Sequence, residues 1–149
     1  MQVLVREIRT SRGGDNGAYT IENADTQSLV IYSDVDYDGQ TEKIRYFLDG
    51  TSLKKGVIEP MGYPVSYPAG SEQIRIISDE VQNNTLPIFF YYNADWPVIT
   101  TGNPMPTPAD PDSIRLIRVH VRLNPKPNDP EHDYVLESFA NIRTLKDNL

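Results

Sequence analysis

The order of apolar and polar residues predicts one short helix followed by a series of β-strands. Near the N-terminus, Leu4 and Ile8 lie one helical turn apart while charged side chains fill the other faces, and Gly13 with Gly14 ends the pattern. We therefore expect an amphipathic helix over residues 1–13. Since no capping residue precedes it, this segment is either the lower half of a longer helix or a complete helix of about three turns.

From Ala18 onward the chain consists of short runs of β-branched and aromatic residues bounded by Asp, Gly or Asn, which is typical of an antiparallel meander. Within one run, Ile44 and Tyr46 share a face that alternates with Lys43, as in a half-buried strand. Asp49 with Gly50 indicates a tight hairpin turn. The first four predicted strands are residues 18–22, 28–33, 42–48 and 52–59.

The second half of the chain continues the β pattern with a long interruption. Residues 71–83 form either a short helix or a strand, and a slip in the apolar pattern at Leu116 suggests a bulge. The stretch from Ala94 to Asp112 carries five prolines, and we expect it to serve as flexible linkage. The later predicted strands are residues 87–93, 113–125 and 134–145.

These elements predict a single domain over residues 1–149, of the α+β class. In it the N-terminal helix, residues 1–13, packs on an antiparallel β-sheet meander that forms a β-rich head over residues 18–145. The 149 residues suffice for one moderate core, and 38% hydrophobic residues with 23% charged residues are typical of a folded, water-soluble chain. A net charge of -7 argues against a nucleic-acid partner, because that affinity comes largely from lysines and arginines.

The most informative segment is SDVDYDGQTE, residues 33–42, between two predicted strands. Asp34, Asp36 and Asp38 occupy alternate positions before Gly39, and three carboxylates this close repel one another unless water or a cation neutralises them. Hard oxygen ligands of this kind are what a calcium ion uses. The sequence therefore offers a metal site as its main chemical hypothesis.

The expected site is a calcium loop within a β-hairpin. A helix-flanked calcium loop counted from Asp34 would need a glutamate at its twelfth position, where this chain has Arg45, so that motif is excluded. In the hairpin, the three aspartates supply carboxylates, Gln40 supplies its carbonyl and Glu42 closes the shell. The alternative is a solvated acidic turn. Such open sites bind calcium at roughly 0.1 to 1 mM, which suits an extracellular setting.

Other candidate chemistry is sparse. The chain has no cysteine, no nucleophile elbow and no glycine-rich phosphate loop, so we do not expect an enzyme. Arg118, His120 and Arg122 share one face of a predicted strand, and we expect them to pair with an acidic neighbouring strand. Trp96 is either part of an aromatic platform for a sugar ring or a packing residue.

The order of elements resembles that of type IV pilin-like proteins. The segment from Val5 to Pro60 is most similar to the J-type minor pseudopilins of type II secretion systems and to the minor pilins of type IV pili, in which a helix runs into a strand pair around LDG-x-x-L-x-K/R. The matching residues are Arg45, Tyr46, Leu48, Leu53 and Lys55. The resemblance continues through residues 74–96 and 114–125 into the closing strand.

The resemblance implies a non-enzymatic structural subunit that packs beside other pilin or pseudopilin subunits in an extracytoplasmic filament. The leader peptide and hydrophobic helix of that family do not occur before Val3, so it implies a soluble head that reaches the membrane only through a preceding helix. An alternative is a secreted calcium-dependent carbohydrate-binding or adhesion β domain. A leader and an apolar helix upstream of Val3 would separate the two.

Overall fold

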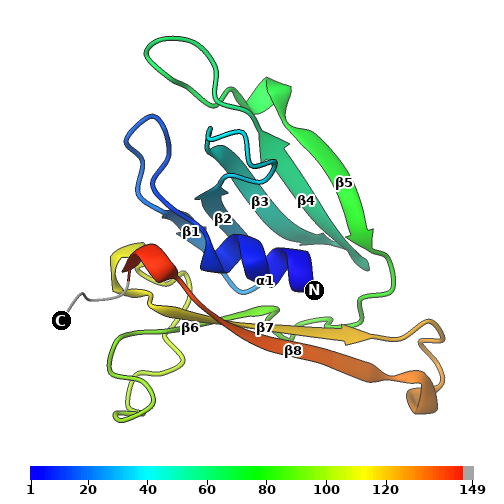
Figure 1. Ribbon diagram of the computed structural model, residues 1–149. Helices are drawn as coiled ribbons and strands as arrows, with labels where there is room; N and C mark the ends of the chain where they lie inside the picture. The colour runs from blue at the N-terminus through cyan, green and yellow to red at the C-terminus, as the bar shows by residue number, and fades with distance from the viewer. Residues whose placement is uncertain (146–149) are drawn as a thin grey trace.

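The computed structural model, which describes residues 1–145, is mostly β with one short α-helix (Figure 1). Among these residues, three short 3₁₀ turns lie in the connections between strands and a fourth follows the last strand. The helix and strands are α1 Gln2–Arg9, β1 Ile21–Ala24, β2 Ser28–Ser33, β3 Glu42–Asp49, β4 Ser52–Ile58, β5 Gln73–Ser78, β6 Phe89–Tyr92, β7 Leu116–Leu123 and β8 Tyr134–Asn141. The 3₁₀ turns are η1 Ala69–Ser71, η2 Pro111–Ser113, η3 Pro130–His132 and η4 Arg143–Leu145.

The strands form two separate antiparallel sheets, which corrects the expected α+β fold with a single meander. The meander holds for the five-stranded sheet, whose order is β1-β2-β3-β4-β5, whereas β6, β7 and β8 form a three-stranded sheet of their own. The prediction was wrong because alternating polarity shows that a strand is half buried but does not show which strands it pairs with. With a helix of eight residues, the protein is a β-rich fold rather than a helix-on-sheet α+β fold.

Helix α1 lies between the two sheets, where Figure 1 shows it in front of β2 and above β8. Its buried face carries Leu4 and Ile8, the pair that the sequence pattern singled out. They join a hydrophobic cluster that includes Ile44 of β3, Phe89 of β6 and Val119 of β7. One core therefore connects α1 with both sheets.

A buried polar group also fixes α1 to the five-stranded sheet. Glu7 of α1 forms an ion pair with Lys55 of β4 and accepts a hydrogen bond from the hydroxyl of Tyr46 on β3. Glu7 and Lys55 are only 2% and 3% exposed. Because a buried charge without its partner is costly, these contacts tie the position of the helix to that of the sheet.

The structure settles several local expectations. The helix forms, but it ends at Arg9 because the chain then turns and the backbone N–H of Arg12 donates to the carbonyl of Tyr32 on β2. Residues 73–78 are a strand, β5. The bulge expected near Leu116 is wrong, since β7 pairs in continuous register with both of its neighbours. Within residues 1–145, no helix is both long and apolar enough to cross a membrane.

The proline-rich loop after β6 is anchored rather than a flexible linkage. The backbone N–H of Met105 donates to the carbonyl of Tyr91 on β6 over 2.7 Å, and that of Ala109 donates to the carbonyl of Ala24 on β1 over 2.8 Å. Ala109 is itself buried in the core. The loop thus connects with both sheets, which the density of prolines did not reveal.

Candidate metal centre

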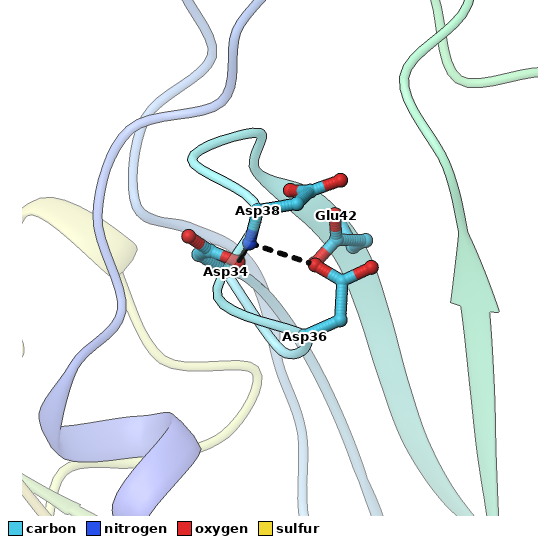
Figure 2. A group of neighbouring side chains, drawn as sticks. All are labelled: Asp34, Asp36, Asp38 and Glu42. Carbon is cyan, nitrogen blue, oxygen red and sulfur yellow. Dashed lines mark hydrogen bonds between the residues drawn. The ribbon is translucent and has the colours of Figure 1, made fainter.

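The turn between β2 and β3 brings together four of the five predicted ligands. Asp34, Asp36, Asp38 and Glu42 each offer a carboxylate oxygen, and these four oxygens all lie within 4.8 Å of one another. Figure 2 shows the four side chains around the turn, with Glu42 at the start of β3. An arrangement of four carboxylates over so short a distance provides hard oxygen ligands for a divalent cation.

Hydrogen bonds within the turn set its shape. The Asp34 carboxylate accepts from the backbone N–H of Gly39 at 2.9 Å, and the N–H of Asp38 lies 3.2 Å from oxygens of both Asp34 and Asp36, as the dashed lines in Figure 2 show. Gly39 adopts φ +87°, a left-handed conformation that favours glycine. The predicted sharp turn at Gly39 is therefore confirmed, and it holds the aspartates in close proximity.

Glu42 differs from the aspartates because it is fully buried. One of its oxygens, Oε2, accepts a hydrogen bond from the backbone N–H of Val35 at 2.7 Å. The other, Oε1, is buried and has no hydrogen-bond partner among residues 1–145. A buried carboxylate oxygen without a donor costs on the order of 1 to 3 kcal/mol, and a cation beside it would remove that cost.

Burial raises the pKa of the Glu42 carboxyl to about 7, against the lowering effect of the hydrogen bond from Val35. The negative charges of Glu59 and Asp36 raise it further. The pKa of Asp36 is also raised, by desolvation first and by its neighbours Asp38 and Asp34. In proteins, carboxylates that repel one another in this way are found at sites that hold a positive ion or a proton.

Arginines from α1 and the segment after it contact the same turn. The Arg12 guanidinium donates to the carbonyl of Gly39 at 2.9 Å and to Oγ1 of Thr41 at 2.7 Å, and it lies 3.8 Å from the Asp34 carboxylate. The Arg6 guanidinium lies 5.7 Å from the ring centre of Tyr37. The acidic turn is therefore coupled to the helix, since a change in its shape alters contacts made by residues of α1 and its C-terminal extension.

Two further residues near the turn, Glu59 and Arg12, are not among the predicted ligands. Glu59 follows Ile58, the cross-strand partner of Lys43, so the hairpin register alone places it opposite Glu42. Arg12 carried no such signal, because its contact depends on how the chain turns after α1. Gln40 is exposed and its backbone N–H donates to Asp38 at 2.8 Å, whereas its role as a carbonyl ligand stays a prediction.

The remaining candidate residues lie on the three-stranded sheet. The expected pairing with an acidic neighbouring strand is confirmed, since Arg118 and His120 both contact Glu137 on β8, with Nδ1 of His120 at 2.7 Å, and Arg122 lies 2.6 Å from Asp133, the residue just before β8. Arg118 lies 3.6 Å from the same Glu137. These contacts occupy the basic face with structural ion pairs.

Comparison with known proteins identifies no relative: neither a family model nor a curated protein sequence matches the chain. The resemblance to pilin-like subunits thus stays a prediction from the residues quoted above.

Proposed function

We propose that this chain is a non-enzymatic structural subunit, the head of a minor pilin or minor pseudopilin, and that a calcium ion holds its β2–β3 turn. The observation that carries the proposal is the buried Glu42: a carboxylate oxygen of this residue lies within 4.8 Å of oxygens from three aspartates, and its Oε1 has no hydrogen-bond partner among residues 1–145. The partners are other pilin or pseudopilin subunits. The place of action is extracytoplasmic, at the cell surface or in a periplasmic filament.

The donor set favours calcium over softer metals. All four acidic side chains bind through carboxylate oxygen, and the group contains neither histidine nor cysteine. Calcium takes six to eight oxygens at about 2.3 to 2.6 Å, so water and backbone carbonyls, including that of Gln40, complete the shell. Three of the four residues are at least partly exposed, and we expect an affinity in the range of about 0.1 to 1 mM.

A bound calcium ion would shape a docking surface rather than a reaction centre. It would neutralise the repulsion among the carboxylates and fix one conformation of the turn, which Arg12 connects to the end of α1. Glu7 and Lys55 hold α1 in turn on the five-stranded sheet. Binding a neighbour on a surface that is already ordered costs less entropy than ordering it on contact.

The calcium part is tested by thermal unfolding with excess chelator and with millimolar calcium. At ten times its dissociation constant, calcium should stabilise the fold by about 1.4 kcal/mol, which raises Tm by roughly 3 to 6 °C for a chain of this size. Asp36→Asn retains the oxygen that accepts from Asp38 but loses a charge, so the calcium shift should vanish. Asp95→Asn, at an exposed acid in another loop, is the matched control. A Tm that calcium leaves unchanged would overturn this part.

The subunit part is tested by the genomic sequence and by assembly. A leader and an apolar helix of about 20 residues encoded upstream of Val3 are expected for a pilin-like subunit. The full-length protein should then cross-link to other pilin-type subunits in cells. A secretion signal without such a helix would favour the alternative, a secreted calcium-dependent carbohydrate-binding or adhesion domain.

A further inference from the structure

A cavity of about 560 Å³ lies beside the three-stranded sheet, away from the acidic turn. Its wall includes Trp96 from the loop after β6, Arg115 just before β7, and Phe139 with Asn141 from β8. Along β8 the intervening Ala140 is buried in the core, so these two side chains belong to the opposite face. The volume falls in the range of about 300 to 1,000 Å³ that is typical of small-ligand sites.

The aromatic part of the wall is held by packing. Trp96 contacts Tyr92, with ring centres 4.7 Å apart and planes inclined by 41°. Tyr92 in turn lies 6.4 Å from the ring of Phe139. Aromatic faces carry partial negative charge and attract the weakly positive C–H groups on one face of a sugar ring. Trp96 and Phe139, which line the cavity and are supported by the buried Tyr92 between them, thus form a suitable aromatic platform for a saccharide.

Arg115 supplies a fixed positive charge in the same wall. Its Nη1 donates to the backbone carbonyls of Asp112 at 2.7 Å and Ile114 at 2.9 Å, which orients the guanidinium. Its Nε is buried without a hydrogen-bond partner among residues 1–145, and no Asp or Glu of the described chain lines the cavity. A guanidinium with donors to spare binds a carboxylate through two parallel hydrogen bonds.

Amide side chains complete the polar part of the cavity. The Oδ1 atom of Asn93 accepts from the N–H of Asp95 at 3.0 Å and from Nδ2 of Asn103 at 2.9 Å. These bonds orient Asn93 so that its own amide nitrogen has no partner within residues 1–145. Asn141, which also lines the cavity, is exposed. Amides of this kind both donate to and accept from sugar hydroxyls.

We propose that this cavity binds an acidic saccharide, a sugar chain that contains a uronic acid. The sugar ring stacks on the aromatic platform, its carboxylate pairs with Arg115, and its hydroxyls bond to Asn93 and Asn141. The absence of acidic side chains from the described lining makes the cavity complementary to an anion although the chain as a whole carries a charge of -7. The inference does not depend on the filament role.

The test uses Trp96, the only tryptophan of the chain, as its own reporter. The protein is titrated with an oligogalacturonide in excess chelator, so that calcium cannot bridge the uronates to the acidic turn. We expect a saturable change in tryptophan fluorescence with a dissociation constant below about 1 mM. A neutral galacto-oligosaccharide of the same length should bind at least tenfold more weakly. Equal binding of the two, or no change with the oligogalacturonide, would overturn the proposal.

Two variants and a control locate the binding. Arg115→Gln should weaken oligogalacturonide binding about tenfold or more, because charge-assisted hydrogen bonds are lost. If that variant unfolds, Asn141→Asp serves instead, since it places a repelling charge at an exposed position in the wall. Arg75→Gln removes the same charge from β5, outside the cavity, and should leave binding unchanged. Binding that survives both cavity variants would contradict the assignment. Benzoate, an aromatic carboxylate without a sugar ring, serves as a further probe. Tighter binding of benzoate than of the oligogalacturonide would also contradict the assignment.

Discussion

The acidic turn and the aromatic cavity are built in opposite ways. The turn collects four carboxylates from nine consecutive residues, 34–42, at one end of the five-stranded sheet. The cavity collects an arginine, two aromatic rings and two amides from three distant segments beside the three-stranded sheet. Residues close together in the sequence suffice for an ion site, since the side chains that bind the ion are small and similar. A cavity for a larger molecule instead needs side chains from several segments that are distant in the sequence and adjacent in the fold.

Helix α1 and the segment directly after it, residues 10–12, are the physical connection between these two regions. Toward the turn, Arg12 bonds to Gly39 and Thr41. Toward the cavity, the guanidinium of Arg9 donates to the carbonyl of Phe139 over 3.2 Å, and the hydroxyl of Thr144 donates to the carbonyl of Ser11. Changes in the attachment of α1 should therefore affect both regions.

The largest effect is expected when the attachment of α1 is broken. Lys55→Ala leaves Glu7 as an uncompensated buried charge, and it should lower the free energy of unfolding by about 3 to 5 kcal/mol. Urea denaturation measures this loss. Lys54→Ala is the matched control, because Lys54 pairs with Asp49 at the surface and should cost less than about 1 kcal/mol. Similar losses in the two variants would show that Glu7 does not fix the helix.

An intermediate effect on the free energy of unfolding is expected from a change in pH, and it arises from Glu42 in the acidic turn. Because burial raises the pKa of Glu42 to about 7, the folded state holds a proton that the unfolded state releases above its ordinary value near 4.5. Without calcium, this group contributes stability that is present below about pH 4.5 and is lost as pH rises through 7. Allowing for solvent screening, the loss between pH 5 and 8 should be roughly 1 to 2 kcal/mol. Glu42→Gln should abolish it in denaturation measured with chelator.

Release of the Glu42 proton when calcium is added distinguishes a calcium site from a solvated acidic turn. If calcium binds Glu42, it displaces that proton, so binding near pH 6 should release close to one proton per ion, and binding near pH 9 should release almost none. Calorimetry in two buffers of different ionisation enthalpy measures the release. Calcium binding with no proton release near pH 6 would mean that the ion is held by the aspartates without Glu42.

The smallest effect is expected at the ion pairs of β7 and β8. Glu137→Gln removes the partner of His120 and Arg118, yet these side chains are partly exposed, and the free energy of unfolding should change by less than about 1 kcal/mol. Calcium and oligogalacturonide binding should both be unaffected. A larger change in either binding measurement would show that the two regions are coupled through β8 as well as through α1.

Much of the local structure followed from the sequence. The runs around Ile44 and Val119 are strands because their apolar residues match the period of two, and Gly50, at φ +62°, lies in the predicted hairpin turn. The pairing of Arg122 with Asp133 also agrees with the expected charge pattern. The overall fold did not follow, since the polarity of β6, β7 and β8 would suit an extension of the first sheet equally well.

By itself, the sequence determined most of the strand segments, though not β5, and that three aspartates occupy one turn, because both depend on neighbours within a few residues. Only the tertiary structure decided that Glu42 is buried with an oxygen unpartnered in the described chain, since its burial depends on the packing around β3. It also decided that Trp96, Arg115 and Phe139 share one cavity. Contacts between distant segments arise from the packing of two sheets around a common core, and no pattern within a single segment encodes that packing.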